Sequence, residues 1–173
     1  MWWARLLNNL AAILSDAGAA ATSYESIATV TVGAGGSSSI TFSSIPSTYK
    51  HLQIRGISRA TSTGANNLVQ FNSDTGSNYS ATSIQADGSR YSSGRETSQT
   101  WLRILGYYFG VSTSTNYSIN TTQIFNYSNA TTYKTTLSRN NNRENGGGVE
   151  TSAFVSTWRS TSAITSMYIY VYG

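Results

Sequence analysis

The side chains able to carry acid–base chemistry are few and widely spaced in this chain. They are Asp16, Glu25, His51, Asp74, Asp87, Glu96, Glu144 and Glu150. A glycosidase-like pair of carboxylates would need two of Asp74, Asp87 and Glu96 to meet at one end of the fold. Asp74 and Asp87, however, stand among Ser, Thr, Asn and Gly, where an aspartate accepts hydrogen bonds from the backbone of its own turn. The sequence therefore predicts turn residues and no catalytic site, and we do not expect an enzyme.

Metal, cofactor and nucleic-acid sites are not predicted either. The chain has no cysteine and a single histidine, which cannot build the usual zinc spacings. Residues 72–76, NSDTG, lack the acidic ligands of an EF-hand loop, and neither a helix nor Lys-Ser/Thr follows the glycines of residues 33–36. The net charge of +4 comes mostly from arginines scattered along the chain without a basic run, so no nucleic-acid partner is expected.

The polar surface that the composition predicts is mostly neutral. Charged residues make up 10% of the chain, against ~25% in ordinary soluble domains, and Ser, Thr, Asn and Gly replace them. The chain also has 12 tyrosines, whose rings suit subunit contacts or stacking on sugars. Near the C-terminus, Tyr168, Tyr170 and Tyr172 alternate with apolar residues and share one face of a predicted strand. We take these three tyrosines as a candidate surface-binding site.

Short strand-like segments recur through most of the chain. Ile27–Val32 and the segment around Ile40 and Phe42 flank a Gly-rich turn and predict a hairpin. In the segment 51–59, Leu52 and Ile54 lie on one face, and Arg55 and Ile57 lie on the other. Further strands are predicted at residues 68–72, 79–84 (as an edge strand), 99–108, 117–127, 133–140, 150–158 and 163–172, with a long loop from 86 to 94. Nine or ten strands at intervals of roughly ten residues predict an all-β fold, a β-sandwich of jelly-roll type.

Residues 1–17 differ from the rest, because their apolar residues recur at three- and four-residue steps and predict a short amphipathic helix. Its apolar stripe consists of Trp3, Leu6, Leu7, Leu10, Ile13 and Leu14. A helix this short is marginal in water, so the stripe needs a partner. The helix could anchor or oligomerise the protein, act as a secretory signal cleaved near residues 17–19, or pack on its own domain or a membrane surface. It is too short to span a membrane.

The predicted organisation is therefore an anchoring or oligomerisation helix (1–17), a linker of small residues (18–23) and a β-sandwich domain (24–173). The stretch YESIATVTVGAGGSSSITFSSIPSTYKHLQIRGISR, followed by FNSDTGSNYS, resembles a recurrent β-sandwich module in virion proteins of tailed bacteriophages of aquatic and cyanobacterial hosts. The resemblance covers residues 24 to about 94, and ITSMYIYVYG is loosely similar to the final strand of the module. It implies a tail-fibre, baseplate or capsid-decorating protein that assembles as a trimer, and it implies no catalytic residues.

We accordingly expect a non-enzymatic structural protein located in the virion. The first expectation is a homotrimeric tail-fibre or baseplate component, anchored by its helix to other phage virion proteins and contacting a host-surface glycan. A capsid cement protein that stabilises the head is the alternative. A secreted, carbohydrate-binding jelly roll is a further alternative, which requires cleavage of the N-terminal segment.

Overall fold

The computed structural model describes residues 24–59, 65–104, 117–143 and 149–172. Its contacts divide the chain into two units, Met1–Thr31 and Val32–Gly173. The described part of the first unit, residues 24–31, is exposed and contains no strand. All the strands described below belong to the second unit.

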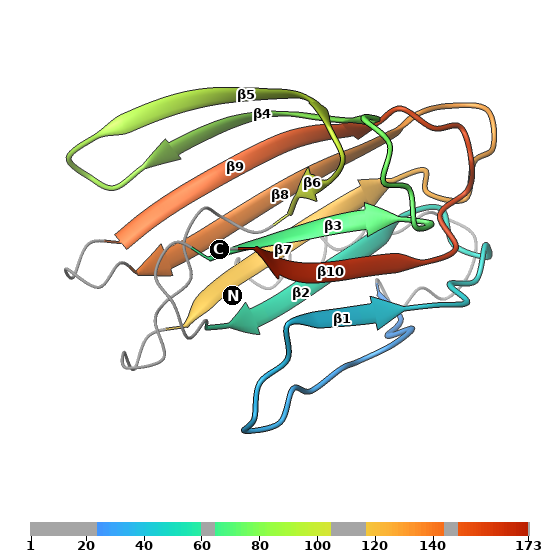
Figure 1. Cartoon of the computed structure of the whole chain (residues 1–173), viewed down its shortest axis with the longest axis horizontal. Coiled ribbons are helices and arrows are strands. Elements are labelled where there is room, and N and C mark those ends of the chain that lie inside the picture. The colour runs from blue at the N-terminus through green and yellow to red at the C-terminus, as the bar shows by residue number, and fades with distance from the viewer. Residues whose placement is uncertain (1–23, 60–64, 105–116, 144–148, 173) are drawn as a thin grey trace, which may run out of the picture. The chain divides into compact units, whose positions relative to one another are not determined.

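The second unit consists of two antiparallel sheets, and the smaller sheet lies across one face of the larger (Figure 1). The four-stranded sheet has the order β1-β10-β3-β6, and the six-stranded sheet has the order β2-β7-β8-β9-β4-β5. The strands are β1 (Ser39–Phe42), β2 (Leu52–Ser58), β3 (Asn66–Phe71), β4 (Tyr79–Ala86), β5 (Tyr91–Gln99), β6 (Leu102–Arg103), β7 (Ser118–Phe125), β8 (Lys134–Arg143), β9 (Val149–Trp158) and β10 (Met167–Tyr172). The described residues contain no helix, so the predicted all-β, two-sheet architecture is confirmed for this part of the chain.

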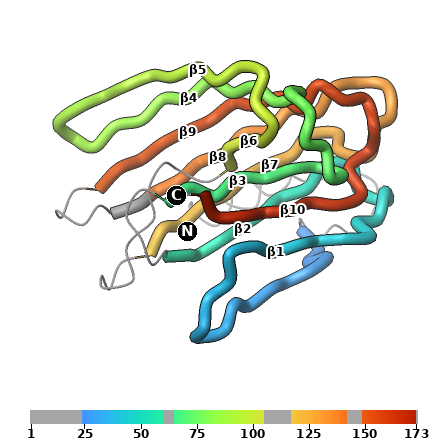
Figure 2. The backbone as a smooth tube through the Cα atoms, viewed as in Figure 1, coloured from blue at the N-terminus to red at the C-terminus, as the bar shows by residue number. Residues whose placement is uncertain are grey.

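The pairing is dominated by partners far apart in sequence. Figure 2 shows β1, near the start of the second unit, beside β10 at its end. Ile40 of β1 lies opposite Ile169 of β10, and β10 also pairs with β3. Because these pairs need the whole chain, the smaller sheet can form only when both ends of the unit have come together.

The core lies between the two sheets. Met167 and Ile169 of β10, together with Phe71 of β3, pack in one cluster with Ile124 of β7 and Trp158 of β9. Burying one such side chain contributes about 1.5–3 kcal/mol, so this cluster is the main force that holds the sheets together.

The inner face of the six-stranded sheet becomes polar toward one end. Asn120, Asn140 and Ser152 are buried neighbours in one row across β7, β8 and β9. Gly56 of β2 lies opposite Asn120, and a Cβ atom at Gly56 would lie 2.4 Å from the Oδ1 atom of Asn120. A side chain at position 56 would therefore force the amide of Asn120 to move.

Several predicted elements differ from the observed ones. Ile27–Val32 forms no strand, and the predicted hairpin is wrong because β1 takes β10 as its partner. β4 is not an edge strand, since it lies between β9 and β5. The predicted loop from 86 to 94 contains the start of β5, which forms the sheet edge instead, and the strand predicted at 99–108 is reduced to β6 within the described residues.

Candidate functional site

The candidate catalytic aspartates Asp74 and Asp87 lie at opposite ends of β4. A strand of this length spans roughly 26 Å, so the two carboxylates cannot act on one bond. Asp87 Oδ1 accepts hydrogen bonds from the backbone N–H groups of Ser89 (2.8 Å) and Arg90 (2.6 Å). These backbone bonds, with Arg90 nearby, lower the pKa of Asp87. The predicted turn role of Asp87 is confirmed.

Asp74 is the centre of a corner that joins the two sheets between β3 and β4. Its Oδ2 accepts a 2.7 Å hydrogen bond from the indole Nε1 of Trp158, and its Oδ1 accepts one of 2.8 Å from the backbone N–H of Gly76. The side-chain amide of Asn78 donates to both oxygens. Burial raises the pKa of Asp74, but the three donors together outweigh it and hold the pKa below the usual value. The carboxylate is thus a structural acceptor, as the turn prediction indicated.

The turn at this corner has an unusual backbone. Asn72 and Ser73 have φ angles of 51° and 58°, and the N–H of Asp74 donates to the carbonyl oxygen of Phe71 at 2.9 Å. Two positive φ angles in succession are typical of a type I′ turn, which favours Asn and Gly. The Oδ1 atom of Asn72 also accepts from the backbone N–H of Thr165, so the same turn fixes the segment before β10.

Among the described residues, the acid–base candidates Glu96 and His51 also have structural partners, and Asp16 and Glu144 lie outside the described residues. Glu96 forms a 2.9 Å ion pair with the buried Arg103. His51 accepts a hydrogen bond at Nδ1 from the N–H of Asn126, as expected for a satisfied polar residue. Glu150 is buried on the inner side of β9. Among the described residues, no three His, Cys, Asp or Glu side chains gather into a group that could hold a metal ion.

The predicted binding tyrosines lie on the outer side of the four-stranded sheet. Met167 and Ile169 are buried, whereas Tyr168 and Tyr172 are exposed at 39% and 66% and Tyr170 is partly exposed. The rings of Tyr168 and Tyr170 stack with centroids 5.3 Å apart and planes 19° apart. The alternation predicted from the sequence is therefore present in β10.

On the β1 side, the neighbours of these rings are neutral and polar. Thr41 of β1 lies opposite Tyr168, and Ser39 lies opposite Tyr170. We call these five residues the tyrosine strip. Burial, and then the neighbouring tyrosines, raise the pKa of Tyr170. Its hydroxyl can donate a hydrogen bond at neutral pH, as that of an ordinary tyrosine can. Flat aromatic surface beside hydroxyl groups suits the stacking and hydrogen bonding of a sugar ring.

A second face, on the outer side of the six-stranded sheet, was not recognised in the sequence. We define this outward face by three rows of paired residues. They are Ile57–Ile119–Asn141–Thr151–Ala86–Tyr91, Arg55–Thr121–Arg139–Ala153–Ile84–Ser93 and Gln53–Gln123–Leu137–Val155–Thr82–Arg95. Solvent-facing sides of antiparallel sheets are usually polar, but here Ile57 is 72% exposed, Ile84 63% and Tyr91 92%.

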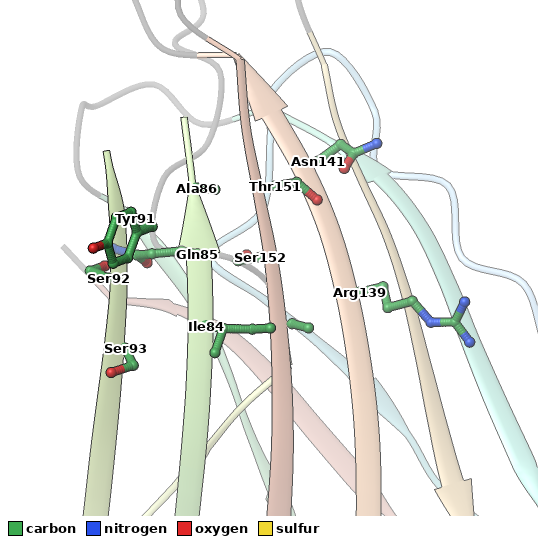
Figure 3. Close-up of a pocket in the computed structure, with 11 residues that line it drawn as sticks. Ile84, Gln85, Ala86, Tyr91, Ser92, Ser93, Arg139, Asn141, Thr151 and Ser152 are labelled. Atoms are coloured by element: carbon green, nitrogen blue, oxygen red, sulfur yellow. The ribbon is translucent and has the colours of Figure 1, made fainter. Parts of the chain in front are cut away.

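The outward face is hollowed over β5, β4, β9 and β8. The groove has a volume of about 570 Å³, and its lining includes Ile84, Tyr91, Thr151 and Arg139. Figure 3 shows Tyr91 at one side of the groove, on β5, and Arg139 at the other, where its side chain extends away from Tyr91 and Ile84. The groove is within the size range of small binding sites, and aliphatic side chains lie between its polar ends.

The charge of the outward face has one sign. Arg55, Arg95 and Arg139 are exposed on it, and none of the residues in its three rows is Asp or Glu. The outward face therefore combines exposed aliphatic groups with exposed arginines.

Comparison with known proteins adds nothing to this geometry. No family model, no curated protein and no solved structure matches the chain. The case for a function therefore depends on the two faces.

The other predicted site residues are not tested by the described structure. Trp3, Leu6, Leu7, Leu10, Ile13 and Leu14, the stripe of the predicted anchoring helix, lie outside the described residues. Within the described ranges, the structure has no helix that is both long and apolar enough to cross a membrane.

The outward face left a partial signal in the sequence. Ile57 was placed on the face opposite Leu52, together with Arg55, and the structure agrees. One such residue is ordinary on a surface. An exposed apolar face can be recognised only from the strand order, which places Ile119 of β7 beside Ile57 and then adds the outward residues of β8, β9 and β4.

Proposed function

We propose that this chain is a non-enzymatic structural protein of a phage virion, a tail-fibre or baseplate component that contacts the host surface. The observation that carries the proposal is the tyrosine strip. A stacked pair of rings, with a third exposed tyrosine and two hydroxyl-bearing neighbours, forms a neutral surface able to bind a host glycan. The sequence resemblance to phage virion modules supports the same assignment, and the helix predicted at residues 1–17 would anchor a trimer on the particle.

We also infer that the sandwich is of the jelly-roll type, which is common in viral capsid and lectin domains. Setting the β8–β9 hairpin aside leaves eight of the ten strands. Renumbered in chain order, these eight follow the orders 1-8-3-6 and 2-7-4-5 in the two sheets. This interleaving supports two Greek keys with one added hairpin, as a jelly roll requires.

The proposed location of the protein at the tail is tested on phage particles purified from cultures that express it. Mass spectrometry should find the chain in purified particles, and labelling followed by electron microscopy should place few copies at the tail. Many copies spread over the shell would assign it to the capsid-decorating class instead. Absence from the particles, or a mature chain cleaved near residues 17–19, would contradict the proposal.

The glycan contact is tested by binding of the full chain to an array of bacterial surface glycans. Losing one exposed stacking ring costs about 1.4 kcal/mol, so Tyr172→Ser should weaken binding about tenfold. Tyr133→Ser is the matched control, because Tyr133 is 56% exposed but lies outside the tyrosine strip. Equal binding by the Tyr172 variant and the original chain would refute a role for the strip.

A further inference from the structure

Residues 27–32, IATVTV, have the sequence of a strand but form none in the described structure. All of them except Ala28 are β-branched, which favours a strand. Ala28, Val30 and Val32 would share one face of an extended chain, and Val30 and Val32 are exposed at 47% and 43%. An exposed, uncharged segment of this kind is suited to join the edge of a sheet.

The edge nearest in sequence, that of β1, is already partly closed. The N–H of Val171 in β10 donates to the carbonyl oxygen of Ser38, so the backbone groups of Ser39 and Thr41 point away from β10. The Oγ atom of Ser37 donates to the carbonyl oxygen of Ser39 at 2.6 Å and accepts from its N–H at 3.3 Å. Only Thr41 then retains open backbone groups on this strand, which is too little for a ladder.

The edge at β2 is longer and apolar on its inner side. β2 pairs only with β7 among the described strands. Its inner residue Leu52 is buried, whereas Ile54 is only partly buried although it packs against the core. Phe42 of β1 is partly buried in the same way, and Figure 1 shows β1 and β2 at the same side of the two sheets. A strand added beside β2 would therefore extend the core over Ile54.

The opposite edge of the six-stranded sheet, at β5, does not suit the segment. The inner side of β5 carries Ser92 and Glu96, which lie opposite Gln85 and Ala81 of β4. Glu96 also forms a 2.9 Å ion pair with the buried Arg103. An aliphatic face placed there would lie against polar groups, so β2 is the edge that matches the segment.

We infer that residues 27–32 of one copy add to β2 of a second copy as an extra strand, with Ala28, Val30 and Val32 toward the core. Among the described residues of one chain, the segment has no partner strand and β2 has an open edge, so the match is completed between copies. The six residues of the segment also fit the seven of β2 in length. Backbone hydrogen bonds supply the affinity, and the aliphatic face fixes the register.

This exchange produces a closed assembly of identical chains. Every copy donates one segment and offers one edge, so the contacts can close into a dimer or a ring. The inference depends neither on the location of the protein nor on glycan binding, and it is tested on the purified full chain.

Cysteine crosslinking tests the contact directly, because the chain has no cysteine of its own. Thr29→Cys and Ile57→Cys are placed in separate chains that are produced in one culture, so that a bismaleimide can link them only between copies. We expect a link between positions 29 and 57, identified by mass spectrometry. Ser93→Cys, at an exposed position of β5, replaces Ile57→Cys in the control and should give no link. No link to position 57, equal links to both positions, or a link within purified monomers of the Thr29 and Ile57 double variant would overturn the inference.

Hydrogen exchange of the backbone amides gives a second measurement. Val30→Pro combined with Thr31→Pro must remove a ladder hydrogen bond, because neighbouring N–H groups point to opposite sides of a strand. The amide hydrogens of β2 that face the added strand should then exchange at least about tenfold faster than in the original chain. Val30→Ile combined with Thr31→Val is the control, which keeps the strand propensity and should keep the slow exchange. Circular dichroism checks that both variants fold. Unchanged exchange in the folded proline variant would refute strand addition, and the particle experiments on the proposed function would be unaffected.

Discussion

The hydrogen bond between Trp158 and Asp74 gives the most quantitative prediction for this fold. Trp158 is 2% exposed and packs against Phe71 and Tyr79, with ring centroids 5.5 and 6.3 Å away. Its indole N–H has Asp74 as acceptor at 2.7 Å, and a hydrogen bond to a charged acceptor contributes about 1.5–3 kcal/mol. Asp74→Asn keeps the shape but replaces one acceptor oxygen with an NH₂ group. Either the indole N–H of Trp158 or the backbone N–H of Gly76 then faces another donor. We therefore expect the free energy of unfolding to fall by about 2 kcal/mol.

This loss can be measured by urea unfolding followed by circular dichroism at pH 7. For a chain of 173 residues, ~2 kcal/mol lowers Tm by about 4–8 °C. Trp158→Phe removes the donor and keeps an aromatic ring, and the cycle of single and double variants should give a coupling of about 1 kcal/mol. Asp87→Asn is the control, and it should cost much less because its partners are local and exposed.

The pH dependence of the same variant follows from the lowered pKa of Asp74. A carboxylate whose pKa is lower in the folded chain stabilises the fold above its ordinary value of 3.8. That contribution is lost as the pH falls through the lower, folded value. The stability difference between the original chain and Asp74→Asn should therefore be full at pH 7 and shrink below about pH 3.8. No difference at pH 7, or an undiminished difference in strong acid, would refute the assigned role.

Three further outcomes test the interior. Gly56→Ala should cost about 1–3 kcal/mol by overpacking against Asn120, and adding Asn120→Ala should restore most of it in urea unfolding. Tyr127→Phe should cost about 1 kcal/mol in the same assay, since the Tyr127 hydroxyl donates to the carbonyl of Pro46. Burial lowers the pKa of the Lys134 ammonium group in the folded chain. The free energy of unfolding should therefore rise as the pH increases from this lowered value to the ordinary value of 10.5. Urea unfolding at a series of pH values should show no such rise for Lys134→Met.

Local features of the fold could be predicted from the sequence. The turn roles of Asp74 and Asp87 depend on neighbours within a few residues, which any conformation of the chain keeps close. The two faces of β2 and β10 follow from the period of two in an extended chain, and the burial of Leu52 and Ile169 agrees with it. Such predictions need no knowledge of which strands are partners.

Strand partners could not be predicted in the same way. Ile27–Val32 has strong strand propensity, yet β1 pairs with β10, the last strand of the chain. The opposite error occurred at β5, whose sequence YSSGRETSQ is rich in Ser and Gly. β5 is a strand because β4 offers it backbone partners from Tyr79 to Ala86. Both errors arise because tertiary pairing overrides local propensity.

The corner gives a physical role to the phrase on which the proposed family resemblance depends. In the phrase FNSDTGSNYS, Phe71 and Tyr79 belong to the core, while Asp74 and Asn78 form the hydrogen-bonded corner with Trp158. These residues hold the two sheets together, so a shared phrase predicts a shared corner. The tyrosine strip and the outward face lie on other strands, mostly outside the phrase. Proteins with the same corner can therefore differ in what they bind.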